Sequence, residues 1–441
     1  MRSGLTRHTW CCVLLTTLSA MLMGYDVGVM SSAILFIKLD MGLSVLREEM
    51  IVGSLNLVAA GAALCAGFFA NRFGRRLTLG FAAAVFFAGA AALAAARGFA
   101  CLMAGRVLTG VGVGFAMMIA PLYSAEISPA RARGFLVSFT EIFVDLGILL
   151  GYLIGFAFQF LSPSFNWRLM LGAGALPALV LALGTLFVLP ESPRWLAMRG
   201  RYTEAMEVLD RTSHATSGGR EHETKRRLEE IVAANELERS IGEGEWSNLN
   251  LSSLARLVKS PSFLALAKLY TVAIGVNFFQ QAAGIEATVY YSPAVFKAAG
   301  VSSQLGMLGT TLGVGFVKLS FVLVATFTLD HVGRKKLLLL SSAGMLVCLA
   351  VVCAAFLVFG INATSPAAAR FPLQGALVIV LAVCGYVAFF SMGWGPIAYV
   401  VSSEIFPPRH RSKALGLSMF VNRIVSRTWP RASINPLPHQ S

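Results

Sequence analysis

A ten-residue segment occurs twice in this chain, and this internal repeat constrains the fold more than any other feature. The segment SAEISPARAR at 124–133 recurs as SSEIFPPRHR at 402–411, and NRFGRR at 71–76 recurs as DHVGRK at 330–335. Two copies of one unit inside a strongly apolar chain are typical of membrane proteins that are built from two related halves. We therefore expect two similar halves with a functional site between them.

The composition predicts an all-α, multi-pass membrane protein. Hydrophobic residues make up 56% of the chain and charged residues only 13%, which is far from the balance of a soluble domain. Apolar runs of about 20 residues, each long enough to cross a hydrocarbon core of ~30 Å, recur along the sequence. We expect an eleventh run to begin near 412 and stop early, after spans at 9–37, 48–70, 77–96, 99–123, 135–160, 167–189, 263–296, 304–329, 337–360 and 373–403.

The formal net charge of +14 could indicate nucleic-acid binding, but the positions of the basic residues argue against it. Most of them fall in alternate short loops, and the opposite loops carry few. Loops that are rich in Lys and Arg stay in the cytoplasm. We therefore expect a cytoplasmic N-terminus, a cytoplasmic connection at 190–262, and no nucleic-acid partner.

The distribution of apolar and polar residues divides the chain into four expected parts. These are a six-helix bundle at 1–189, a cytoplasmic linker with short amphipathic helices at 190–262, a second bundle at 263–426 and a polar tail at 427–441. After Val425 come three prolines and two arginines, which we expect to end the membrane helix. The second bundle would then lack its last one or two helices, leaving about 10–11 spans. A frame change, a retained intron or a splice variant would explain such an end.

Asp26 and Arg106 are charged residues that we expect deep within membrane spans. At about 1.5 Å of helix rise per residue, Asp26 lies ~18 Å from Lys38 and Arg106 lies ~14 Å from Arg97, so their depths match. A carboxylate at that depth is costly unless it is paired, neutral or exposed to water. Protonation of Asp26 would release Arg106, which predicts a proton switch. A permanent structural ion pair is the alternative.

The repeat also relates Asp26 to a second acid. The triplet GYD at 24–26 aligns with GIE at 284–286, so Glu286 is the equivalent of Asp26 in the second half. Lys318 reaches a similar depth from the opposite side on the next span. We predict that Glu286 and Lys318 neutralise one another beside a central cavity.

Glu141 and Asp145 lie four residues apart and therefore share one face of the fifth span. Two acids on one helical face inside a membrane seldom face lipid. We expect them to line a polar cavity. The alternative is that one of them is a protonated acid that packs between helices.

Amides and aromatic rings gather in the second half. Gln280 and Gln281 offer hydrogen-bond donors and acceptors together, and Tyr290 follows in the same span. Trp394, in GWGP at 393–396, is expected at a helix break that faces a cavity, although a tryptophan at the lipid interface is the alternative. This mixture suits a neutral polyhydroxylated ligand better than an ion or a lipid.

These motifs, together with PLYSAE at 121–126 and PESPRW at 190–195, resemble the sugar porter family of the major facilitator superfamily. They occur in the family's order along most of the chain. Within the family, the chain is similar to plant polyol and monosaccharide proton symporters. Glu141 and Glu286 stand where many hexose porters have Gln and Asn, and Lys318 in the eighth span is also similar to the polyol branch.

The resemblance implies a major facilitator fold, in which two pseudo-symmetric six-helix bundles, the second incomplete here, rock about a central site by alternating access. It also implies proton symport, with Asp26 as the proton acceptor and Arg106 as its partner. The substrate contacts that it implies are Glu141, Gln280, Gln281, Glu286, Tyr290, Lys318, Trp394 and Asn422. We expect charged residues of the repeated loops to latch the halves in one state, namely Arg72, Arg75, Arg76, Glu126, Arg133, Asp330, Arg334, Glu404 and Arg411.

Three functions remain open on the sequence. Proton-coupled symport of linear polyols and monosaccharides is favoured, because an uncoupled sugar facilitator would not need the buried acid Asp26. A non-transporting product, such as a sensor or a regulatory partner, would follow from the abnormal end.

An enzyme is not predicted, since no nucleophile–base pair or phosphate-binding loop occurs in a cytoplasmic segment. The seven cysteines lack metal-ligand spacing, so neither a metal nor another cofactor is expected. The expected partners are a polyol or monosaccharide, protons and the lipid bilayer. The resemblance favours the plasma membrane.

Overall fold

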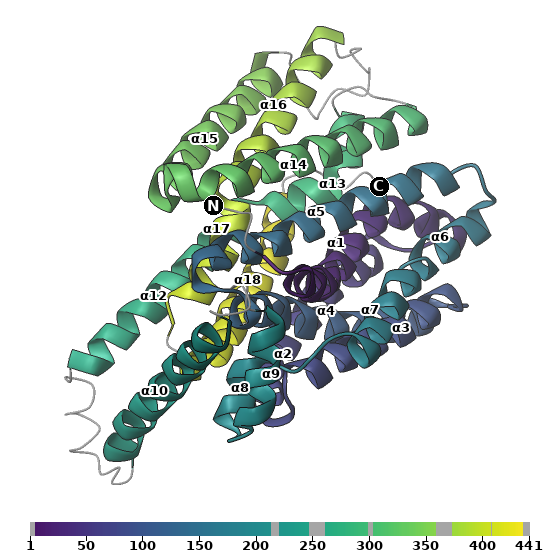
Figure 1. Ribbon diagram of the computed structural model, residues 1–441. Helices are drawn as coiled ribbons and strands as arrows, with labels where there is room; N and C mark the ends of the chain where they lie inside the picture. The colour runs from purple at the N-terminus through teal and green to yellow at the C-terminus, as the bar shows by residue number, and fades with distance from the viewer. Residues whose placement is uncertain are drawn as a thin grey trace.

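Helices make up nearly all of the computed structural model of this protein (Figure 1). The residues that it describes are 5–212, 220–246, 261–298, 303–358, 373–406 and 408–434. Within these ranges no strand is present, as the composition predicts. Nine membrane-spanning helices are found there by length and apolar composition.

The first half contains six spans, the last of which is divided between two helices. Its helices are α1 (Arg7–Met41), α2 (Val45–Phe73), α3 (Arg75–Ala94), α4 (Phe99–Ile127), the short 3-10 helix η1 (Ala130–Ala132), α5 (Arg133–Phe158), α6 (Pro163–Gly172) and α7 (Ala175–Phe187).

Three helices of the connecting segment pack against one another at one end of the molecule (Figure 1). They are α8 (Pro193–Met198), α9 (Tyr202–Thr212) and α10 (Arg220–Trp246). Helix α9 buries its apolar face, including Ala205 and Leu209, while Glu204 and Arg211 remain on the exposed side. This amphipathic pattern is the one that the sequence predicts for the linker.

The second half repeats the long spans and adds two internal breaks. Its helices are α12 (Pro261–Ala282), α13 (Ile285–Ala298), α14 (Gln304–Val332), α15 (Arg334–Val358), α16 (Leu373–Met392), α17 (Trp394–Glu404) and α18 (Pro408–Ile434). In Figure 1, α14, α15 and α16 lie at the top, and α3 and α7 lie on the opposite side of α1 and α5.

Two helix breaks place polar groups at the centre of the molecule. Gly284 separates α12 from α13 with φ +85°, a conformation that glycine adopts without steric cost. This break puts Gln280 and Gln281 at the end of one helix and Glu286 at the start of the next. Gly393 separates α16 from α17, which confirms the helix break predicted at GWGP.

The helical backbone extends beyond the point at which the apolar pattern ends, although α18 is not among the nine membrane-spanning candidates of the described residues. Helix α18 continues past Val425 to Ile434, with Pro430 inside it. A proline removes one backbone N–H and bends a helix, but the flanking residues can keep helical dihedral angles. The side chains beyond Ser426 lie outside the described part of the structure.

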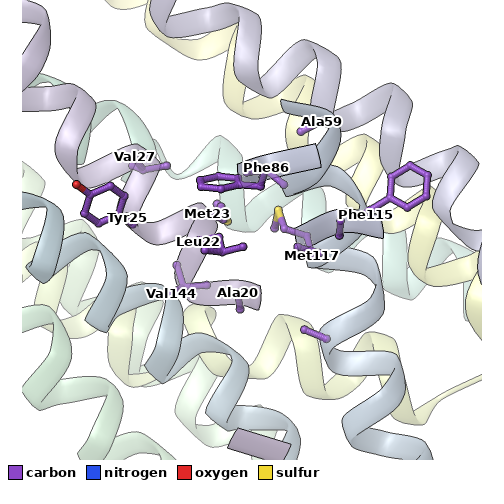
Figure 2. Packing of buried hydrophobic residues seen from close by; sticks show 14 of the residues in the cluster. Ala20, Leu22, Met23, Tyr25, Val27, Ala59, Phe86, Phe115, Met117 and Val144 are labelled. Atoms are coloured by element: carbon purple, nitrogen blue, oxygen red, sulfur yellow. The ribbon is translucent and has the colours of Figure 1, made fainter. Parts of the chain in front are cut away.

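Helix α1 forms the core of the first half and approaches α5 closely. Its side chains Leu22 and Met23 lie in the buried cluster with Phe86 and Met117 (Figure 2). A Cβ atom added at Gly24 would lie 1.9 Å from the carbonyl oxygen of Val144 on α5. Such close contact between backbones is available only to small residues.

Candidate functional site

Asp26 and Arg106 form a buried ion pair within the first half. The Arg106 Nη1 atom lies 2.8 Å and 2.6 Å from the two carboxylate oxygens of Asp26. Arg106 Nε donates a third hydrogen bond, 3.0 Å long, to the carbonyl oxygen of Ile51 on α2. The contact predicted from matching depths is therefore present. Because both side chains are almost fully buried, loss of either charge would leave the other uncompensated.

A cavity of about 30 Å³ lies between the two halves. Its volume is of the order of one ordered water molecule, so it is much smaller than a hexitol. Helices α1 and α5 contribute to it from the first half, and α12, α13, α14, α16, α17 and α18 contribute from the second. The polar side chains that line it are Glu141, Gln280, Gln281, Glu286, Lys318, Tyr399 and Arg423.

Arg423 and Tyr399 are lining residues that the sequence reasoning did not single out. Arg423 is nearly inaccessible to solvent, with 1% of its surface exposed. A charged residue inside an apolar helix is itself a signal of a functional position. That signal was available in the eleventh run, next to the predicted contact Asn422.

Three amide side chains are joined by hydrogen bonds beside this cavity. Asn422 Nδ2 donates to Gln280 Oε1 at 2.7 Å, and Gln281 Nε2 donates to Asn422 Oδ1 at 3.1 Å. Gln280 Nε2 donates to the carbonyl oxygens of Trp394 and Gly395. Within the described part of the chain, Gln281 Oε1 is buried without a hydrogen-bond partner. It is therefore available to accept a hydrogen bond from a hydroxyl group.

Glu286 pairs with Arg423 and not with Lys318, so the predicted Glu286–Lys318 pair is wrong. Arg423 Nη1 contacts Glu286 Oε1, and Ser426 Oγ donates to Glu286 Oε2. Asn56 Nδ2, from α2 of the first half, also donates to Glu286 Oε2 at 3.0 Å. The position of Glu286 in the first turn of α13 turns its carboxylate toward α2 and α18.

Lys318 pairs with Asp145, across the boundary between the halves. Its ammonium group donates to Asp145 Oδ1, and both side chains are buried. Asp145 lies on α5 and Lys318 on α14, and these two helices pack side by side (Figure 1). The depth of Lys318 in the membrane had suggested Glu286 of the second half as its partner. The face of α14 that carries Lys318 packs against α5 instead.

Tyr290 and Trp394 meet the site in different ways. Tyr290 is buried, and within the described residues its hydroxyl has no hydrogen-bond partner. It lies within electrostatic reach of both Asp26 and Glu286. Trp394 brings its carbonyl oxygen to Gln280, whereas its indole donates to Ser342 Oγ on α15 at 3.0 Å.

Three of the predicted gating residues of the first half, Arg75, Arg76 and Glu126, join one hydrogen-bond network, in which Arg75 and Glu126 are buried. Arg75 donates two hydrogen bonds, of 2.8 Å and 2.7 Å, to the two oxygens of Glu126. Ser192 Oγ, from the segment before α8, donates to the same carboxylate at 2.5 Å. Arg76 donates to the carbonyl oxygens of Thr185 and Leu186. This network joins α3, α4 and α7 to the connecting segment.

Glu191 is a second acid in this network, and the sequence reasoning missed it. It accepts hydrogen bonds from the backbone N–H groups of Arg75, Arg76 and Ser192, so it caps the start of α3. Burial raises the pKa of Glu191 above its ordinary value, although these N–H groups partly oppose that effect. The PESPRW segment carried it, but a single acid beside two prolines gives no clear structural signal.

In the second half, Arg334 pairs with Glu404 at 2.7 Å. This pair lies against the first half, since a Cβ atom at Gly134 would be 3.1 Å from Glu404 Oε1. Arg133 lies within electrostatic reach of Glu404 and Glu126. The remaining predicted gating residues make local contacts or are not described. Arg72 lies over the Phe73 ring, and Arg411 Nη2 donates to the Phe406 carbonyl oxygen. The Asp330 side chain lies outside the described part of the structure.

Two halves of membrane helices that enclose a polar cavity are the architecture of the major facilitator transporters. The sequence profile of the sugar (and other) transporter family matches residues 11–429. The chain therefore belongs to the sugar (and other) transporter family, as the motif resemblance predicted, and it is an integral membrane protein.

Two plant relatives and one solved structure are closely similar. "Polyol transporter 5" of Arabidopsis thaliana is 42% identical over 433 residues, which cover 95% of this chain and 76% of the relative. "Probable polyol transporter 4" of the same plant is 44% identical over 430 residues, with coverages of 96% and 76%. The proton:xylose symporter XylE bound to 6-bromo-6-deoxy-D-glucose superposes with a TM-score of 0.81 at 28% identity, covering 97% of this chain and 89% of that one.

Proposed function

We propose that this protein is a proton-coupled symporter of linear polyols and monosaccharides that works by alternating access. The observation that carries the proposal is the buried Asp26–Arg106 pair, with N–O distances of 2.8 Å and 2.6 Å. Asp26 can bind and release a proton, whereas Arg106 keeps its charge at all physiological pH values. Protonation of Asp26 removes the partner of Arg106 and frees it to move.

Contacts along α2 connect this pair with the central cavity. Arg106 Nε holds the carbonyl oxygen of Ile51, and Asn56 of the same helix donates to Glu286 at the cavity. Release of Arg106 would therefore act on the helix that also touches the substrate site. Tyr290, within electrostatic reach of Asp26 and Glu286, provides a second connection.

The chemistry of the cavity supports a neutral ligand with many hydroxyl groups. Glu141 and Glu286 are acceptors, Lys318 and Arg423 are donors, and the amides of Gln280 and Gln281 supply both functions. Each hydroxyl of a polyol can donate and accept, so it can satisfy either kind of group. The cavity of about 30 Å³ must expand for such a ligand to enter, which requires the two halves to move.

The same proposal includes the arrangement in the membrane. The connecting segment and the N-terminus would be cytoplasmic, because they lie on the same side of the membrane as the arginine-rich loops, and such loops stay in the cytoplasm. The parts 1–189, 190–262, 263–426 and 427–441 would be the first bundle, the linker, the second bundle and a tail. The plasma membrane is the proposed location, since uptake from outside the cell is where a proton gradient drives accumulation.

Uptake of sorbitol and of glucose tests this function in yeast that lacks its own sugar carriers. We expect uptake that collapses with a protonophore and in the Asp26→Asn variant, while Asp40→Asn, which alters an acid paired with Arg168 outside this site, retains it. Uptake that is insensitive to both treatments would show an uncoupled facilitator. A chain that reaches the membrane without any uptake would contradict transport.

A further inference from the structure

The internal repeat relates two buried charges, Asp145, which does not line the cavity, and Arg423, which does. Arg133 and Arg411 close the two copies of the repeated loop, and Asp145 and Arg423 each lie twelve residues beyond them. Asp145 and Arg423 are therefore equivalent positions on equivalent helices, α5 and α18. Each has 1% of its surface exposed.

Each of these two residues pairs with an opposite charge, and each also makes a contact with the other half. Asp145, in the first half, pairs with Lys318 on α14 of the second half. Arg423, in the second half, donates to Asn56 Oδ1 on α2 of the first half at 3.4 Å and pairs with Glu286. Helix α5 packs on α14, and α2 packs on α18, so the two contacts lie on two matching seams.

The charges are reversed between the two contacts. The acid Asp145 pairs with the cation Lys318, whereas the cation Arg423 pairs with the acid Glu286. Lys318 and Glu286 both line the cavity, and each is paired with a buried residue of opposite charge, of which Arg423 also lines the cavity. Arg423 also donates two hydrogen bonds to Asn422 Oδ1, at 3.0 Å from Nε and 2.5 Å from Nη2. A guanidinium group can only donate, so it keeps the oxygen of this amide turned toward itself.

We propose that Asp145 and Arg423 are a repeat-related pair of positioning residues, which aim Lys318 and Glu286 at a polyhydroxylated substrate from the two seams. The inference rests on the proposed function. Neither residue needs to touch the substrate for this role. Their buried pairing holds the long, flexible side chains of Lys318 and Glu286 in place. Ordering these side chains when the substrate binds would otherwise reduce the binding free energy.

A double-mutant cycle tests the Asp145 arm. Asp145→Asn should raise the KM for sorbitol about tenfold, with little change in the maximal rate or in the amount of protein in the membrane. In a Lys318→Gln background the same change should alter KM by about twofold or less, because Asp145 acts through Lys318. Glu48→Gln, which alters an exposed pair with Lys38, is the control and should leave KM unchanged.

A purely structural role for Asp145 predicts a different result. Its substitution would then lower the amount of folded protein and keep its effect on KM in the Lys318→Gln background, which would overturn the proposal. Arg423→Lys tests the second arm, since an ammonium can pair with Glu286 but cannot reproduce the guanidinium fork that also holds Asn422. We expect it to raise KM with the maximal rate retained, and an unchanged KM would overturn this arm.

The sorbitol affinity of the same variants is also measured with the purified full-length proteins. Sorbitol binding without proton-driven uptake would contradict the proposed function, yet the affinities of the cycle variants would still report on Asp145 and that of Arg423→Lys on Arg423. A chain that binds neither sorbitol nor glucose would overturn both the function and this inference.

Discussion

Glu126, which is buried, and Glu191, which is partly buried, are neighbouring acids that are held by different partners. Glu126 is paired with the guanidinium of Arg75, whereas Glu191 accepts hydrogen bonds from backbone N–H groups. A glutamine can still accept from N–H groups, but it cannot neutralise a buried arginine. We therefore expect Glu126→Gln to lower the free energy of unfolding by about 3–5 kcal/mol and Glu191→Gln to lower it by much less.

Thermal unfolding of the purified variants in one detergent measures this difference. Equal losses of stability in the two variants would contradict the assignment of the buried charge pair to Glu126. Arg72→Gln is a suitable control, because Arg72 is an exposed side chain of the same basic loop.

Lys318 shows what residue-level reasoning from sequence can and cannot predict. Counting residues from the end of a helix gives depth in the membrane, and depth correctly predicted that Asp26 would meet Arg106. Depth says nothing about which face of the helix a residue occupies, or which helix lies next to that face. Lys318 therefore pairs with Asp145, although Glu286 was expected at a similar depth.

At the scale of helices, α1 and α5 pack with their backbones in close contact. Gly24 is packed against the backbone of Val144, where an added Cβ atom would lie 1.9 Å from the carbonyl oxygen. We expect Gly24→Ala to push the helices apart and to lower the free energy of unfolding by about 1–3 kcal/mol. Gly61→Ala on α2 is the matched control, since no atom lies within 4 Å of its added Cβ.

Thermal unfolding and sorbitol uptake of these two alanine variants provide the measurement. A Gly24→Ala protein as stable and active as Gly61→Ala would show that the close approach of α1 and α5 is not required.

Helix α2 contacts both the Asp26–Arg106 pair and Glu286, a side chain that lines the cavity. Ile51 accepts from Arg106, and Asn56 donates to Glu286. We expect Asn56→Ala to reduce the accumulation of sorbitol by about 3-fold to 10-fold, because the two sites would be less tightly coupled. Exchange of sorbitol at equal concentrations should change little, since it does not require net proton movement. A variant with normal accumulation would exclude α2 as the connection.

The elements themselves were largely predictable, and their ends were not. Long apolar runs predicted the spans, and GWGP predicted the break that begins α17 at Trp394. The backbone of α18 stays helical to Ile434, past the end of the apolar pattern, because prolines and arginines oppose membrane insertion more strongly than they oppose helical backbone. The break at Gly284 was not predicted, although it positions Gln281 and Glu286.

On the scale of the whole molecule, the internal repeat was the most informative feature of the sequence. It predicted two halves, and it also relates Asp145 to Arg423 on the two seams. It could not show that the cavity is closed to about 30 Å³, because that volume depends on how the halves are tilted. In the proposed mechanism the halves rock, and the energy for accumulation enters through a group that binds protons.

Sorbitol-driven proton movement is the most direct test of this account. The full chain is reconstituted in lipid vesicles, sorbitol is added outside, and the external pH is recorded while labelled sorbitol exchange is measured in parallel. The account predicts that the external medium becomes more alkaline with the parent protein, and that Asp26→Asn exchanges sorbitol without any change of pH. Sorbitol-driven alkalinisation that persists in Asp26→Asn would contradict the assignment of Asp26 as the proton-binding group.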